Sequence, residues 1–256
     1  MCTLILGRDV VAPGTVLLAA NRDEDPARPS DPPRVLVERP RVIGGRDRRA
    51  GGTWLAVRDD RAVVAVLNRR PDPGTPASDR RSRGALVIDV ASVPASDGEG
   101  FARAALDRAR RALDEAAYAP FTLVYAAADT SWMIVHDAGD TAAVRTIDPG
   151  WHVVTHADLD DPTEPRTAWL MDELRGFAPA SADDAERRLV ALLASHGDRA
   201  RGVPPVCLHE GAMVTVSASL AWITGDGLRY RHAEGRPCEH PFTDPRPRLA
   251  PAGRLA

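Results

Sequence analysis

Lysine is absent from the 256-residue sequence, so all 33 basic side chains are arginine. They face 36 acidic residues, which leaves a net charge of −3 at pH 7. A chain this close to neutrality has no general attraction for nucleic acid or for an anionic membrane surface. We therefore expect no nucleic-acid partner, and any ligand must be recognised at a local site.

Long apolar runs are absent as well. No stretch reaches the roughly 18 consecutive apolar residues that a membrane-spanning helix needs, so no transmembrane segment is predicted. The opening CTLILG is too short for a secretion signal and has no basic region before it. These absences favour a cytoplasmic location, where cysteines stay reduced.

Cysteine is scarce, with Cys2, Cys207 and Cys238 as the only three. This odd number at wide spacing predicts no disulfide framework. Cys207 in CLHE and Cys238 in CEH lack paired metal-binding spacing. His152 and His156 are four apart in WHVVTH, which in a strand separates them by roughly 13 Å. With no P-loop or dinucleotide motif either, the sequence predicts neither a metal site nor a cofactor.

The patterns that are present alternate between strand and helix. The order of strands, helices, strands, helices and strands fits two sheets between helical layers, and it also fits an ordinary α+β domain. We expect one domain over residues 1–256, with a proline-rich tail after 241 that frays, and an irregular loop over 25–40. Strands are predicted over 2–8, 15–22, 51–60, 61–70, 121–127, 131–137, 151–157, 212–224 and 227–233, and helices over 85–93, 100–117, 166–177 and 181–197.

Cys2 occupies a chemically special position. Met1 before a small residue is expected to be removed, which would expose the Cys2 α-amine. That amine, with a pKa of about 7.7 to 8.0, is a base within one residue of a strongly nucleophilic thiol. The alternative is a small buried hydrophobe at the start of a strand.

Asn21, Arg22 and Asp23 end the strand that we predict to pair with the Cys2 strand, so a hairpin returns them close to the thiol. An arginine there lowers a thiol pKa, and an aspartate holds an ammonium group or orients the arginine. The alternative is a charged turn at a hairpin end.

Several segments together resemble a known family. In order they are MC, ANRDE, GGTWLAV, VLNRR and SRGALV, followed by FTLVYAA, THADLDDP and VTVSASL. They resemble the NRDE family, whose eukaryotic namesake is transport and Golgi organization protein 2. The resemblance covers most of the chain and implies an α+β fold, the four-layer αββα sandwich of N-terminal nucleophile hydrolases.

The resemblance also implies roles for individual residues. Cys2 becomes nucleophile and general base, and Arg22 and Asp23 become the charged pair beside it. Asn68, at the end of a predicted strand, matches an oxyanion-hole asparagine. His156 stands where relatives have a second asparagine, so an imidazole replaces an amide.

A second group of residues is expected to bind substrate. Gly51 and Gly52 permit positive φ or close backbone approach near the site. Trp54 has the pattern of a core residue, with ligand stacking as the alternative. Asn21 and Arg83, the latter in SRGALV, complete the predicted binding residues.

Two functions from different classes remain open. The first is hydrolysis of a linear amide or related acyl bond by an N-terminal cysteine. The second is a non-catalytic intracellular carrier of haem or acyl lipid on the same fold, since fold does not fix function. A scaffolding module with an arginine-rich surface is a third possibility. Related amidases place an arginine in the late strand, where this sequence has Val216 and Ser217. The expected partner is a small amide, acyl or haem-like ligand, and the oligomeric state is open.

Overall fold

A computed structural model describes residues 2–58, 61–70, 80–94, 98–137 and 142–245. Most of the tail predicted to fray, residues 246–256, lies outside the described residues. Phe242 and Thr243 are nevertheless ordered. Phe242 packs in the same hydrophobic core cluster as Leu170 and Leu189, and Thr243 forms a β-bridge to His232. Within the described part of the chain, none of the helices combines the length and hydrophobicity needed to span a membrane.

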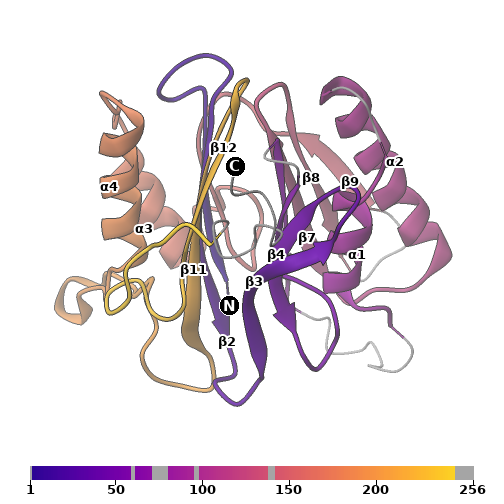
Figure 1. Cartoon of the computed structure of the whole chain (residues 1–256). Helices are drawn as coiled ribbons and strands as arrows, with labels where there is room; N and C mark the ends of the chain where they lie inside the picture. Colours follow the sequence, from indigo (N-terminus) through magenta and orange to yellow (C-terminus); the bar gives the residue numbers. More distant parts are fainter. Residues whose placement is uncertain (1, 59–60, 71–79, 95–97, 138–141, 246–256) are drawn as a thin grey trace, which may run out of the picture.

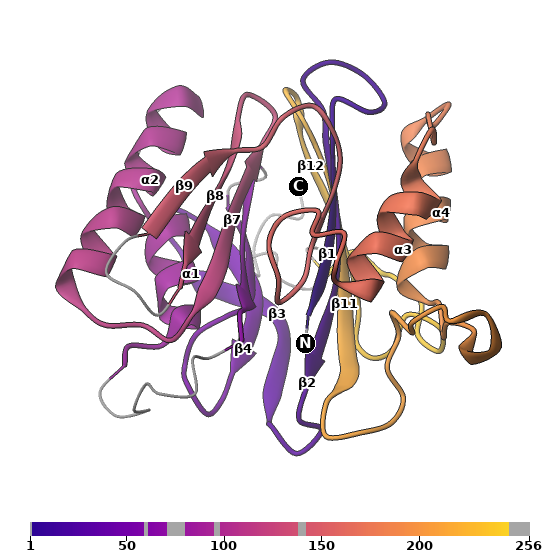
Figure 2. The same cartoon turned by 180° about the vertical axis from the view of Figure 1, so that it is seen from behind.

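The elements form four layers, with two sheets face to face and a helical layer outside each (Figures 1 and 2). The five-stranded sheet contains, in spatial order, β10 (Gly150–Val154), β1 (Thr3–Arg8), β2 (Val16–Glu24), β11 (Val214–Thr224) and β12 (Gly227–Ala233). The seven-stranded sheet contains β3 (Ser30–Val37), β4 (Val42–Asp47), β5 (Leu55–Arg58), β6 (Ala62–Asn68), β7 (Phe121–Ala127), β8 (Ser131–His136) and β9 (Ala142–Thr146). All neighbouring strands are antiparallel.

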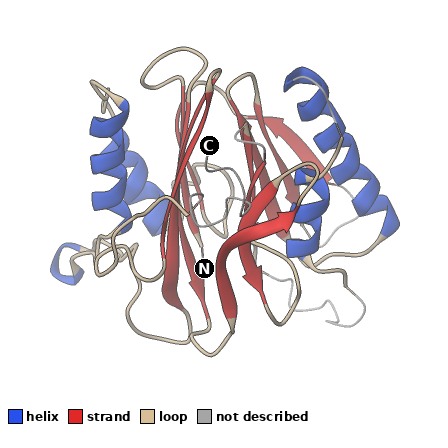
Figure 3. Ribbon diagram, viewed as in Figure 1, coloured by secondary structure: helices blue, strands red, loops and turns tan. Residues whose placement is uncertain are grey.

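Helices cover the outer face of each sheet (Figure 3). The seven-stranded sheet packs against α1 (Arg83–Ala91) and α2 (Gly98–Glu115). The five-stranded sheet packs against α3 (Pro165–Leu174) and α4 (Ala182–Leu193), and a short 3-10 turn, η1 (Arg199–Arg201), follows. The αββα sandwich expected from the resemblance is confirmed.

Burial on both faces explains the strand sequences. In β6, Val64 and Val66 face α1 and α2, whereas Val63 and Leu67 face the core between the sheets. A strand covered on both sides is a continuous apolar run because neither face meets water. The run AVVAVL therefore has no polar alternation.

The predicted loop over 25–40 is wrong in its middle, where β3 runs from Ser30 to Val37. This strand lies at the edge of its sheet, and its pairing with β4 shifts register between Asp31 and Arg34. Pro32 and Pro33 fall in this irregularity, where no ladder donor is required. Strands β4 and β9 were also not predicted.

Other local predictions are confirmed. The first hairpin pairs Thr3 with Asn21 and continues to Arg8 with Val16. Helix α4 begins after Ser181, whose Oγ accepts a hydrogen bond from the backbone nitrogen of Asp184 at 3.1 Å. This N-cap satisfies one of the backbone donors that a helix start leaves unpaired.

Candidate active site

Cys2 precedes β1 and packs against the core between the two sheets. It lines two cavities that share Arg22, Trp54 and Val66. One, between the sheets, encloses about 20 Å³ and has room for about one water molecule. The other opens outward and encloses about 390 Å³, a volume typical of small-ligand sites.

The environment of the sulfur keeps it protonated. Burial, and then the negative charge of Asp23, raise the pKa of the Cys2 thiol, while the charge of Arg22 acts in the opposite direction. The sulfur lies 3.9 Å from the backbone carbonyl oxygen of Asp23. A thiol whose pKa exceeds its ordinary value of about 8.5 needs a base before it can attack at neutral pH.

Arg22 supplies a fixed positive charge on the same face as the sulfur. Its guanidinium lies 4.0 Å from the centre of the Trp54 ring and donates to the Ser30 hydroxyl at 3.1 Å. Glu24 is 3.8 Å away. Burial lowers the pKa of Arg22, yet an arginine stays protonated at neutral pH. The stacked geometry holds this charge in place beside the thiol.

Asp23 lines the larger cavity with Cys2, but its carboxylate turns toward α3. One oxygen accepts a 2.7 Å hydrogen bond from the Thr215 hydroxyl, and the other lies 3.3 Å from Arg166 Nη1. The same Nη1 donates to the Thr3 hydroxyl at 2.8 Å. Because successive strand residues point to opposite faces, Arg22 and Asp23 are divided between the two faces of the sheet.

Arg166 was missed in the sequence, although one signal was present. It stands in the first turn of α3, where the helix dipole disfavours a positive charge. An arginine there indicates a specific anionic partner, which here is Asp23. Burial raises the pKa of Asp23, and Thr215 and Arg166 act against that rise.

The two predicted oxyanion donors are placed differently. Asn68, at the end of β6, is exposed and lines the larger cavity with Cys2. His156 is buried, and it is not among the described residues that line either cavity. Burial, with the positive charge of Arg70, lowers the pKa of His156. The structure brings only Asn68 to the cavity of the thiol.

Three of the predicted substrate-binding residues line the larger cavity: Gly52, Trp54 and Arg83. Trp54 is half-buried under the Arg22 guanidinium, so it joins the packing and the cavity wall at once. Arg83 donates to the Pro120 carbonyl at 2.9 Å, and burial lowers its pKa.

The two predicted glycines serve separate backbone needs. Gly51 has φ +73° and does not line either cavity. A Cβ at Gly52 would lie 2.2 Å from the backbone carbon of Gly84. Close approach of these two backbones brings the start of α1 against the cavity wall.

Asn21 borders the narrow cavity, but its amide group holds the fold together. Its Nδ2 donates to the carbonyl of Leu193 at 2.9 Å and to that of Val206 at 3.1 Å. These bonds join the end of α4 to the segment before β11. A substrate cannot use this amide nitrogen without displacing them.

Ser217 is a candidate site residue that the sequence reasoning did not select. Strand β11 bulges at Val216, and Ser217 then pairs with Arg22. Its hydroxyl is buried, has no hydrogen-bond partner among the described residues, and borders the narrow cavity with Cys2. The available signal was its position in the late strand, where the family resemblance implies an arginine.

The larger cavity is electropositive. Five arginines and three acidic residues line it, the arginines being Arg22, Arg28, Arg80, Arg81 and Arg83. Arg28 lies 2.7 Å from Asp47 and 3.7 Å from Glu24, and Arg81 lies 2.7 Å from Asp89 outside the lining. The positive surplus therefore rests mainly on Arg80 and Arg83, together with Arg22. The excess positive charge favours a ligand that carries an anionic group.

The family model for Transport and Golgi organisation 2 matches residues 1–200. The chain belongs to this family. None of the curated proteins matches it in sequence. This Transport and Golgi organisation 2 family member is similar in structure to a Caenorhabditis elegans N-acylethanolamine-hydrolyzing acid amidase ortholog, at 13% identity and TM-score 0.57, over 86% of this chain and 92% of that one. It is also similar to the C2A mutant of conjugated bile acid hydrolase from Clostridium perfringens, at 12% identity and TM-score 0.46, over 95% and 96%.

The likeness to the amidase shows that this Transport and Golgi organisation 2 family member has the N-terminal nucleophile hydrolase-type fold. The family resemblance found in the sequence is thereby confirmed. At 13% identity the comparison does not extend to individual residues.

Proposed function

We propose that this protein is an N-terminal-cysteine hydrolase of a linear amide or related acyl bond. The observation that carries the proposal is the Cys2 thiol at the head of β1, in a cavity of about 390 Å³ beside the fixed charge of Arg22. A neighbour in fold is named as an amidase, which agrees with this reaction class.

The base in this proposal is the α-amine of Cys2, freed by removal of Met1. Thr3 pairs with Asn21, and the same antiparallel register extended by one residue would set Cys2 opposite Arg22, with Asp23 beyond it on the amino side of Cys2. A carboxylate there stabilises the ammonium form of the amine. In this proposal the positive charge of Arg22 acts on the sulfur and the negative charge of Asp23 acts on the amine. The two side chains lie on opposite faces of β2.

The reaction then runs in two stages. The amine takes the thiol proton, Sγ attacks the carbonyl carbon, and the ammonium protonates the leaving amine as the C–N bond breaks. Water, deprotonated by the same amine, attacks the thioester and releases a carboxylic acid and the free thiol. The Asn68 amide and the Ser217 hydroxyl are the donors proposed for the oxyanion, with Arg22 adding positive charge.

The cavity also favours a substrate class. Trp54 offers apolar contact, and the excess of arginine in the cavity lining attracts an anionic group. A substrate with an acyl chain and a negative charge satisfies both. The proposed substrate is therefore an anionic N-acyl amide.

The test uses one protein in two forms. An N-terminal extension ending in a protease site is placed before Cys2, and cleavage leaves Cys2 as the first residue. With an N-acyl amide of a fluorogenic amine that bears a carboxylate, the cleaved form is expected to release the amine and to carry a thioester on Cys2 by intact mass. The uncleaved form and cleaved Cys2→Ala are expected to do neither, because an amide nitrogen is not a base.

The outcomes separate the two functions left open by the sequence. Equal amine release before and after cleavage would contradict the role of the amine. Binding of the amide by the cleaved form without acylation of Cys2 would overturn the hydrolase in favour of the carrier.

A further inference from the structure

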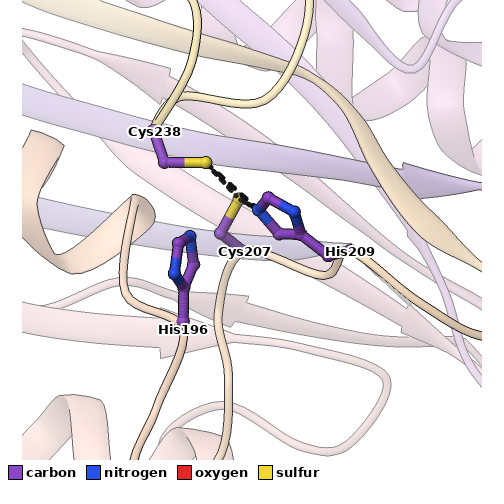
Figure 4. Close-up of side chains that lie close together, drawn as sticks. All are labelled: His196, Cys207, His209 and Cys238. Atoms are coloured by element: carbon purple, nitrogen blue, oxygen red, sulfur yellow. Dashed lines mark hydrogen bonds between the residues drawn. The ribbon is translucent and has the colours of Figure 1, made fainter.

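Four metal-binding side chains meet on the helical side of the five-stranded sheet, away from Cys2. They are His196 after α4, Cys207 and His209 before β11, and Cys238 after β12 (Figure 4). One donor atom from each lies within 4.8 Å of all the others. We refer to these four residues as the late Cys/His cluster. The geometry points to a structural Zn²⁺ site.

The distances suit one tetrahedral ion. The sulfurs of Cys207 and Cys238 are 3.5 Å apart, and His209 Nε2 lies 3.2 Å from Cys238 Sγ and 3.8 Å from Cys207 Sγ. With Zn–S bonds of about 2.3 Å and Zn–N bonds of about 2.05 Å, tetrahedral angles separate two sulfurs by about 3.8 Å and a sulfur and a nitrogen by about 3.6 Å. The observed separations differ from these by about 0.4 Å or less.

His196 supplies the fourth donor. Its ring meets the His209 ring edge to face, with centroids 4.6 Å apart and an interplanar angle of 74°. One of its ring nitrogens lies within 4.8 Å of the donor atoms of the other three residues. Two thiolates and two imidazoles fill four positions and form a closed structural site.

The surroundings support the ligands. His209 turns its other ring nitrogen, Nδ1, toward the Glu239 carboxylate at 3.7 Å. A carboxylate behind a ligand histidine fixes the ring orientation and raises its basicity. The backbone nitrogen of Cys207 donates to the Ser195 carbonyl at 2.8 Å, which holds the residue before His196 against the Cys207 segment.

A metal here would join three segments that have little regular secondary structure of their own. Binding releases the two thiol protons to solvent and cross-links residues 194–213 to the segment after β12. The segment before β11 also contacts Thr215, the residue of β11 that donates a hydrogen bond to Asp23. The Leu208 nitrogen donates to the Thr215 hydroxyl at 2.8 Å. The site therefore braces the strand end that positions Asp23.

The sequence predicted no metal site because neither CLHE nor CEH has paired metal-binding spacing by itself. Cys207 and His209 form one C-x-H pair, whereas His196 and Cys238 are 11 residues before and 31 residues after Cys207. Only the fold brings these ligands together. The signal that was available is the gathering of both late cysteines with histidines in the last quarter of the chain.

The test is metal content of the whole protein, purified without a polyhistidine tag. We expect inductively coupled plasma mass spectrometry to find about one Zn²⁺ per chain in the parent. The Cys207→Ser and Cys238→Ser variants should lose that zinc. The matched controls His240→Ala and Cys2→Ser change a neighbouring histidine and a remote cysteine, and they should keep the zinc. Removal of zinc from the parent by a chelator should lower its melting temperature, and added zinc should restore it.

A second measurement covers variants that fold poorly. Titration of chelator-treated parent with Co²⁺ should give the strong visible bands of tetrahedral cobalt and thiolate charge-transfer bands. A parent with no stoichiometric zinc and no such bands would overturn the site. So would a non-reduced parent lighter by two hydrogen atoms, since a Cys207–Cys238 disulfide would then occupy the thiols. These outcomes are independent of the chemistry of Cys2.

Discussion

Replacing Arg166 by methionine removes a cation that contacts a carboxylate without solvent exposure. Asp23 is 0% exposed at its side chain and Arg166 is 9% exposed, with 3.3 Å between Nη1 and Oδ2. Methionine keeps much of the arginine's bulk but withdraws one compensating positive charge from the buried carboxylate. Removing one partner of a buried pair costs 3–5 kcal/mol, and the remaining Thr215 hydrogen bond favours the lower end, about 3 kcal/mol. Urea unfolding at neutral pH measures this loss, which also corresponds to a fall in melting temperature of roughly 6 to 12 °C.

The sign of the pH dependence gives a sharper test of Arg166→Met. Burial already raises the pKa of Asp23, and loss of Arg166 raises that pKa further. At acid pH below the ordinary carboxyl pKa of about 3.9, Asp23 is protonated in both states and the charge costs nothing. As pH rises from this value to the raised pKa of Asp23 in the folded state, Asp23 loses its proton in the unfolded state first. The free energy of unfolding therefore falls over this range. The loss should therefore be large at neutral pH and small near about pH 4.

Two variants complete the experiment. Asp23→Asn in the Arg166→Met background removes the buried negative charge and should recover much of the lost stability. Arg175→Met is the matched control, because its pair with Asp172 is 79% and 70% exposed, and it should change stability by less than about 0.5 kcal/mol. An equal loss at both pH values, or no recovery with asparagine, would refute the reasoning.

Three further predictions concern other residues. Burial lowers the pKa of His232 to about 4. Between about pH 6.5 and about pH 4 only the unfolded state takes up a proton on this histidine, so the free energy of unfolding should fall by roughly 3 kcal/mol as pH drops through this range. Unfolding of the parent and of His232→Phe across the same range measures the difference. Gly52→Ala should cost about 2 to 3 kcal/mol by overpacking against a backbone, whereas Gly51→Ala should cost about 1 kcal/mol through its positive φ; thermal unfolding of both would contradict the geometry if the order were reversed. Arg22→Gln should raise the pKa of the Cys2 thiol further, which moves the pH profile of its alkylation to higher pH, and an unmoved profile would mean that the guanidinium does not act on the sulfur.

Local patterns in the sequence were sufficient for most of the elements. Apolar runs predicted the first and last hairpins, and the Ser181 cap with its acidic first turn predicted the start of α4. The hairpin alone was enough to place Arg22 beside Cys2, because antiparallel pairing of two strands joined by a short connection fixes which residues lie opposite one another. The family resemblance supplied the layer order that these local patterns left open.

The tertiary structure decided what depends on segments that meet from afar. Pro32 and Pro33 disfavour a strand locally, yet the edge of the sheet accepts one because an edge strand can leave donors unpaired. The alternation of β2 could be foreseen, but α3 and its Arg166 decide that Asp23 meets a cation on the far side from the thiol. The late Cys/His cluster likewise forms only when the end of α4, the segment before β11 and the segment after β12 meet on one face of a sheet. In a helix or strand, the periodic pattern of apolar residues predicts which face a side chain occupies. An irregular segment has no such period, so packing across the whole fold determines which residues it contacts.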